Sequence, residues 1–418
     1  MTRTAPREQT GTHDAVVILT AGSIVLALAF GVRSVFGGVV EPVSNELFGG
    51  RIEVFSLSIA IQNLVWGLAQ PAFGAIADKY GDRLALWLGF GCYVLGMLVC
   101  SLGSTPLAQH LGTGVLVGMG LSGTAFGVVL AVVGRAAPED KRSAYLGLTS
   151  AFGSAGQVVL PLMVSFLLES LDWRLVMIVV GAMLLPMALC IPFLHCKTVP
   201  LQRGEPVTIS SFVRQAFGHS SFVMLTVGFF VCGFHLAFVT AHLPNYVETF
   251  CLAAGLSPQE LRAFGLQALA LAGLANIFGT LIAARLGTIF PKPYVLAWIY
   301  AIRAVVIVAF ISLPLTQTSV MIFALAMGFL WLSTVPLTSA LVLVMFGPRA
   351  MGTLFGFVFL GHQLGSFTGV WLGGFYFDRF GNYEGIWILS AVLGLLSALM
   401  HLGVREESVP LRPALRAA

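Results

Sequence analysis

Three polar side chains interrupt two long apolar stretches of the chain at matching depths. Arg33 lies about five residues beyond the middle of the stretch 15–40, roughly 8 Å from its centre at 1.5 Å per helical residue. Gln62 and Asn63 fall at about the same depth in the next stretch, counted from the same side. A guanidinium flanked by amides can hold an oxyanion, whereas a structural arginine would bond carbonyls or reach toward water. These three residues are therefore the leading candidates for an anion-binding site.

Other polar residues lie near the middle of further apolar stretches. Amide and imidazole groups at that depth can hydrogen-bond a solute, and an imidazole can also carry a proton near neutral pH. A single buried histidine is usually a packing residue, but two at one depth with amides nearby keep the binding interpretation open. These binding candidates are Gln157, His235, Asn276, His362 and Gln363.

The composition identifies the environment of these residues. The chain is 57% hydrophobic and only 10% charged over 418 residues, which excludes a water-soluble fold. Long stretches that are apolar on all sides favour helices over the alternating strands of a barrel. We therefore predict an all-α polytopic membrane protein with twelve transmembrane helices in two six-helix bundles. The predicted spans are 15–40, 55–77, 84–101, 111–133, 144–168, 175–194, 222–243, 264–284, 294–313, 320–345, 354–377 and 386–402.

The longest polar interruption divides these helices six and six. It predicts an N-terminal bundle at 1–194, a cytoplasmic linker at 195–220, and a C-terminal bundle with a cytoplasmic tail at 221–418. The halves also share a glycine spacing: Gly147 and Gly156 in the fifth span match Gly356 and Gly365 in the eleventh. Six-helix halves related as repeats are typical of alternating-access carriers, whose solute site lies between the halves.

The distribution of basic residues predicts the orientation. With the N-terminus in the cytoplasm, only Arg51, Arg174, Arg262 and Arg379 of the basic residues outside the spans fall on the outer side. The positive-inside rule then predicts a multi-pass protein of the cytoplasmic (inner) membrane with both termini cytoplasmic. We expect a monomer whose partners are the lipid bilayer and a small-molecule solute. The net charge of +4 is no argument for a nucleic-acid partner.

Carboxylates are missing from the middle of every predicted span. The nearest is Glu41, at the outer end of the first span. If solute movement is coupled to protons, the proton must be carried by His235, His362, Glu41 or the solute itself, and uncoupled diffusion or anion exchange stays open.

The segment G-A-I-A-D-K-Y-G-D-R, between the second and third spans, resembles the signature loop of the major facilitator superfamily. The resemblance implies a cytoplasmic latch between the two halves, formed here by Gly74, Asp78, Gly81 and Arg83. It also implies that spans five, seven, eight and eleven line the central cavity. The ninth span, which carries Arg303, would be peripheral, so that arginine has either a structural role or a supporting role behind the solute contacts.

Within the superfamily the chain resembles the monocarboxylate and oxalate/formate transporter-like branch. The segments that carry this resemblance are G-V-R-S-V-F-G, S-I-A-I-Q-N-L-V-W-G-L-A-Q-P, F-F-V-C-G-F-H-L-A-F and G-H-Q-L-G-S-F-T-G-V-W-L-G-G. The branch commonly carries an arginine in the eighth helix for the substrate carboxylate. Asn276 is the only polar residue in the comparable stretch of this chain.

Three functions follow as hypotheses. The first is a secondary active transporter, a symporter or antiporter, that moves a small monocarboxylate-like organic anion by alternating access. The second is an exporter of a larger amphipathic or lipophilic metabolite, because the eighth-helix arginine is absent. The third is a transporter-like sensor that binds a ligand without moving it.

Catalysis is not expected from this sequence. The chain has no nucleotide-binding glycine loop, no metal-ligand spacing and no nucleophile with a paired base, so we expect no catalytic residue, metal site or cofactor. The six cysteines lie mostly in apolar spans without paired spacing, as small buried hydrophobic residues do.

Overall fold

The computed structural model describes residues 12–138, 142–195, 209–250, 256–346 and 351–409, and the regular secondary structure of these ranges is helical. The first half of the chain forms α1 (Thr12–Ser34), α2 (Phe36–Phe48), α3 (Ile52–Tyr80), α4 (Asp82–Leu102), α5 (Pro106–Gln109), the π-helix η1 (His110–Leu116), α6 (Val117–Thr124), α7 (Phe126–Ala136), α8 (Arg142–Leu168), α9 (Trp173–Ala182), α10 (Leu185–Cys190) and the 3-10 helix η3 (Ile191–Phe193). The second half forms α11 (Ile209–Phe217), α12 (Ser220–Phe250), α13 (Pro258–Ile289), α14 (Lys292–Ser312), α15 (Gln317–Leu330), α16 (Thr334–Phe346), α17 (Met351–Phe380) and α18 (Glu384–Leu402).

Eleven helical segments of the described chain are long and apolar enough to cross a membrane. The remaining predicted span, 354–377, lies in α17, which has 30 residues but is not one of those eleven. At 1.5 Å per residue α17 is about 45 Å long, enough to cross a hydrocarbon core of about 30 Å. It packs against α12 and α3, so part of its surface is protein-facing and can carry polar residues. The predicted all-α polytopic class is confirmed.

Several helices extend beyond the apolar stretches that predicted them. The clearest case is α13, which begins at Pro258 rather than near residue 264. The Ser257 side chain accepts the backbone N–H of Glu260, and the Glu260 side chain accepts that of Ser257, so a capping box starts the helix. Arg262 consequently lies on a helix rather than in a loop.

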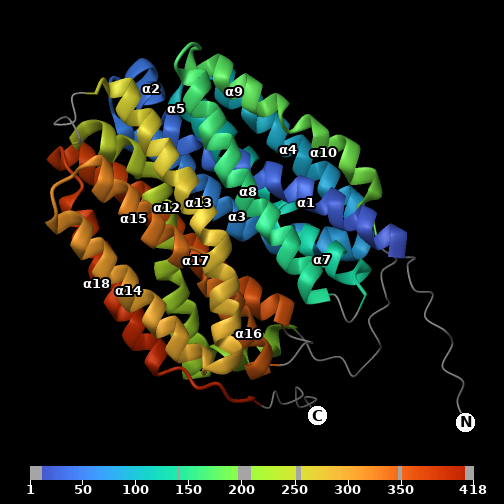
Figure 1. Cartoon of the computed structure of the whole chain (residues 1–418). Helices are drawn as coiled ribbons and strands as arrows, with labels where there is room; N and C mark the ends of the chain where they lie inside the picture. Colours follow the sequence, from blue (N-terminus) through green and yellow to red (C-terminus); the bar gives the residue numbers. More distant parts are fainter. Residues whose placement is uncertain (1–11, 139–141, 196–208, 251–255, 347–350, 410–418) are drawn as a thin grey trace, which may run out of the picture.

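The two groups of helices lie side by side in Figure 1, the first in blue to green and the second in yellow-green to red. The most extensive contacts between them join α3 with α17, α8 with α13, and α2 with α12, and α2 also touches α13. The last element before the predicted linker, η3, ends at Phe193, and α12 begins at Ser220. The domain boundaries at 194 and 221 remain a prediction.

The glycines that match between the halves have matching surroundings. A methyl group built on Gly156 of α8 would overlap the backbone carbonyl of Ala27 on α1, and one built on Gly365 of α17 would overlap that of Phe230 on α12. Each glycine therefore lets its helix touch the first long helix of its own half. This equivalence supports the internal repeat that the glycine spacing predicts.

The halves touch closely at one end of the bundle, and two glycines toward the other end have open space around them. We call the end with the α2–α3 and α12–α13 connections the distal end, and the end where α1 begins and α18 finishes the terminal end. Toward the distal end, a methyl group on Gly37 of α2 would overlap the carbonyl oxygen of Thr240 on α12. Toward the terminal end, methyl groups on Gly147 and Gly356 would meet no atom within 4 Å. This state is closed at the distal end.

Candidate functional site

A narrow cavity lies where α1, α2 and α3 face α12 and α17. Its wall combines polar residues of the first half with small and apolar residues of the second. The site therefore lies between the halves, where a rocking motion would alter it. The lining residues are Arg33, Phe36, Gly37, Ile59, Gln62, Asn63, Ala237, Thr240, Ala241 and Val370.

The structure brings Arg33, Gln62 and Asn63 together in this wall. The Arg33 Nη2 donates to Asn63 Oδ1 at 2.9 Å, and the guanidinium carbon lies 5.2 Å from the ring centroid of Trp66. Asn63 also donates to the carbonyl of Ile59 at 2.8 Å, which orients its oxygen toward the arginine. Gln62 donates to the carbonyl of Thr113 at 3.1 Å. These contacts hold the guanidinium against the cavity.

The charge of Arg33 is not neutralised by a neighbouring carboxylate. Arg33 is 7% exposed and has no ion-pair partner among the described residues. Its Nε atom is buried without a hydrogen-bond partner. Because a buried cation is costly unless it is paired, this arrangement favours an anionic ligand.

A second narrow cavity lies between α8 and α13 and shares Thr240 with the first. Two of the predicted residues, Gln157 and Asn276, line it with Ser34, Leu269, Gly273 and Trp331. The Asn276 Nδ2 donates to Ser154 Oγ of the first half at 3.1 Å, and its Oδ1 accepts the backbone N–H of Leu332 at 2.9 Å. Asn276 thus links the second half to the first, and it also holds the backbone next to Trp331, which forms part of the cavity wall.

A break in the helix of the tenth predicted span lies beside this cavity. Helix α15 ends at Leu330 and α16 begins at Thr334. The broken turn leaves carbonyls without helical partners, and Arg303 Nη2 donates to those of Leu330 and Trp331. Arg303 is 1% exposed and lines neither cavity. Arg303 therefore binds the backbone of Trp331 and caps the C-terminal end of α15.

The other three candidate residues line neither of these cavities. His235 of α12 contacts the carbonyl of Ser390 on α18 through Nε2 at 2.7 Å, and is 1% exposed. His362 of α17 contacts Gln363 Oε1 at 3.2 Å and stacks on Phe359. The Nε2 atom of Gln363 is buried without a partner. A direct solute contact of these residues stays a prediction.

Residues that sequence reasoning missed complete the walls. Thr240 lines both cavities, and its hydroxyl donates to the carbonyl of Leu236 in the same helix at 2.7 Å. Trp66 supports Arg33 from α3. The available signal was spacing: Asn63 and Trp66 are three residues apart, which places them on one face of a helix.

Comparisons with known proteins agree with this architecture. The family model described as the Major Facilitator Superfamily matches residues 22–359 and 253–418. The chain belongs to the major facilitator superfamily. It is similar to "Monocarboxylate transporter 13" of Bos taurus, with 26% identity over 388 residues that cover 90% of this chain and 87% of the relative. It is also similar to "Aspyridones efflux protein apdF" of Emericella nidulans, with 23% identity, 95% of this chain and 79% of the relative.

A solved structure shares the fold. The inward-facing, occupied form of a bacterial homologue to the human lysosomal transporter Spinster has a TM-score of 0.71 and 16% identity, and the match covers 94% of this chain and 97% of that chain. The predicted superfamily and its monocarboxylate transporter-like resemblance are confirmed. The chain is a multi-pass membrane protein, and its relatives point to a transporter rather than an enzyme.

The superfamily signature segment is mostly helical here. Helix α3 runs through Tyr80, so Gly74 is inside the helix and Gly81, with φ +100°, forms the turn. The expected loop between the second and third spans is therefore much shorter than predicted. Arg83 donates to the carbonyl of Pro192 and contacts His195 Nδ1 at 2.9 Å, both within the first half. The side chain of Asp78 lies outside the described residues, and the latch between the halves stays a prediction.

Proposed function

We propose that this protein is a secondary active transporter that moves a small organic anion of the monocarboxylate type by alternating access. The observation that carries the proposal is the buried Arg33 guanidinium, which lines a cavity between the halves and has no carboxylate partner among the described residues. A carboxylate in that cavity would complete the pairing that the protein leaves open.

The narrowness of the cavities favours a small solute. In this state each of the two adjoining spaces leaves room for about one water molecule, so the walls must part to admit any solute. Apart from Arg33 the described lining is neutral, so one anionic group is the expected charge of the solute. The apolar residues beside it, such as Ile59, Phe36 and Leu269, would accept a short hydrocarbon portion.

We further propose that the terminal end faces the cytoplasm of a cell whose inner membrane holds the protein as a monomer. Arg83, Arg135, Arg285, Lys292 and Arg405 lie toward the terminal end, and the positive-inside rule supports this orientation. The closed distal end would then face outward, and the solute would reach Arg33 from the cytoplasm in this state.

Uptake into proteoliposomes tests the function. Purified protein reconstituted in liposomes loaded with unlabelled pyruvate should accumulate labelled pyruvate from outside, and excess propionate should inhibit it. Protein-free liposomes are the control. Binding without accumulation would favour the sensor. Inhibition by large lipophilic compounds but not by short carboxylates would favour the metabolite exporter, whose supporting observation is the otherwise neutral lining.

A further inference from the structure

A three-residue ion cluster joins the two halves at the distal end. Arg262 of α13 donates to Glu248 of α12 through Nε at 2.8 Å and Nη2 at 2.7 Å. Its Nη2 also donates to Glu41 of α2, which belongs to the first half. The side chains are 16%, 11% and 23% exposed for Arg262, Glu248 and Glu41. Two partly buried carboxylates therefore share one guanidinium.

The two ion pairs respond differently to movement of the halves. Glu248 and Arg262 are fourteen residues apart in sequence and belong to packed helices of one half, so their pair moves as a unit. The pair of Glu41 with Arg262 crosses from one half to the other. Opening the distal end must therefore separate Glu41 from its cation while Glu248 keeps it.

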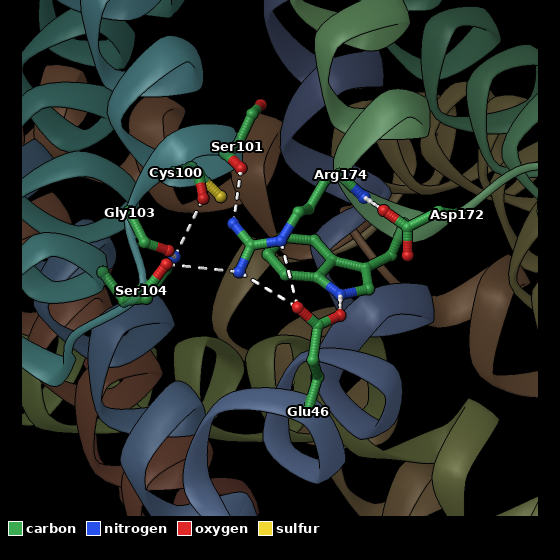
Figure 2. A network of polar contacts seen from close by, with 9 residues as sticks. Glu46, Cys100, Ser101, Gly103, Ser104, Asp172 and Arg174 are labelled. Atoms are coloured by element: carbon green, nitrogen blue, oxygen red, sulfur yellow. Dashed lines mark hydrogen bonds and ion pairs between the residues drawn. The ribbon is translucent and has the colours of Figure 1, made fainter.

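Helix α2 is attached to the first half by a second polar network, drawn in Figure 2. Glu46 accepts from Trp173 Nε1 at 2.6 Å and from Arg174 Nε at 3.0 Å, both on α9. Arg174 Nη1 donates to the carbonyl of Ser101 on α4 at 2.9 Å. Because Glu46 lies five residues after Glu41, Glu41 moves with the first half and cannot follow Arg262.

The charged groups that face Glu41 from the helices packed around it are Arg262 and Glu248. The amide of Asn45 donates to Glu41 from its own helix. Other acids near this end have their own partners: Glu46 binds α9, and Glu53 pairs with Arg51. Asp378 of α17 also reaches the first half, where it accepts the backbone N–H groups of residues 52 and 53, but it is exposed and has no ion-pair partner among the described residues. Within the described residues, Glu41 is the acid whose side chain pairs with a cation of the other half.

We propose that Glu41 is a proton-binding site of this carrier, and that a proton on Glu41 releases the distal end. With Glu41 ionised, opening would leave a carboxylate without its cation in a partly buried position. A proton removes that charge, so the proton binds more tightly to the distal-open state than to the closed one. By linkage, proton binding then shifts the population toward opening.

The two buried histidines fit this role less well. The described hydrogen bonds of His235 and His362 run to Ser390 and Gln363, which belong to the same half as the histidines themselves. A proton on either would not break an ion pair between the halves. The inference rests on the alternating access in the proposed function, but not on the identity of the solute.

Distance measurements between spin labels test the proposal without any solute. Labels attached through Ser170→Cys in the first half and Gln259→Cys in the second report the distal end, in a background with the six native cysteines replaced by alanine. The separation should be short near pH 8 and should lengthen as the pH falls to about 4, the range of moderately perturbed carboxylates. Glu41→Gln should lengthen the mean separation at pH 8 and remove its dependence on pH.

The variants give the size of the effect and its controls. Glu41→Gln should lower the ratio of closed to open populations about tenfold at pH 8, between the values for exposed and buried ion pairs. Glu248→Gln keeps the pair of Glu41 with Arg262, so it should stay closed at pH 8 and retain the pH response. Arg262→Gln should be open at the distal end at pH 8.

Two results would overturn the proposal. One is a wild-type label separation that does not change with pH, and the other is a wild-type pH response in Glu41→Gln. Neither result would contradict the proposed uptake of an organic anion.

Discussion

Arg33→Lys is expected to lose anion binding almost as completely as Arg33→Ala. Lysine supplies a point charge without the planar fork, and it cannot keep both the Asn63 hydrogen bond and the stacking on Trp66. The loss of a charge-assisted pair in a partly dry cavity should weaken pyruvate binding by about 2–5 kcal/mol, more than about thirtyfold. Titration calorimetry on both variants measures it.

The melting temperature separates a binding arginine from a structural one. Arg33→Ala should melt at or above the wild-type temperature, because it removes an unpaired buried charge and its desolvation cost. Arg303→Leu is the matched control. It should melt lower, since the carbonyls of Leu330 and Trp331 lose their donor, and its pyruvate affinity should be preserved. Wild-type affinity in the Arg33 variants with a lower melting temperature would show a structural arginine.

Gly37→Val is expected to hold the distal end open and stop transport. A side chain on Gly37 would overlap the backbone carbonyl of Thr240, and a backbone atom cannot move aside as a flexible side chain can. Overpacking of about 1–3 kcal/mol would shift the closed population five- to more than a hundredfold. Pyruvate uptake should fall accordingly, and the separation between labels at positions 170 and 259 should lengthen at pH 8.

Gly91→Ala is the control for that substitution. Gly91 is exposed on α4, and a methyl group there would meet no atom within 4 Å. Its uptake and label separation should match wild type. If Gly37→Val also kept wild-type uptake and separation, the contact of α2 with α12 would not be the closed distal state.

The sequence predicts how deep in the membrane a polar residue lies, but it does not predict which face of its helix the residue occupies. Counting residues along two apolar stretches placed Arg33 and Asn63 at one level, and their side chains are bonded at 2.9 Å. The same count placed His235 at mid-depth, yet His235 points to α18 rather than to a described cavity. A helix that is apolar on all sides has no polar stripe to reveal which face meets the other half.

Partners far apart in the chain were also beyond sequence reasoning. The pair of Glu41 and Arg262 spans 221 residues, and the contacts of Arg303 depend on how α14 packs on α15. The pattern Ser257-Pro258-Gln259-Glu260 is a capping-box sequence that could have placed the start of α13 before Arg262. Hydropathy alone missed it because the first turn of α13 is polar.

The most direct test of the anion site compares two ligands of nearly equal shape. Propionate and propionamide differ mainly in charge, so titration of each into the purified protein near pH 7 isolates the contribution of the carboxylate. The account predicts that propionate binds at least about thirtyfold more tightly and that Arg33→Ala abolishes this preference. Equal affinities in the wild-type protein, or a preference that survives in Arg33→Ala, would contradict an anion site at Arg33.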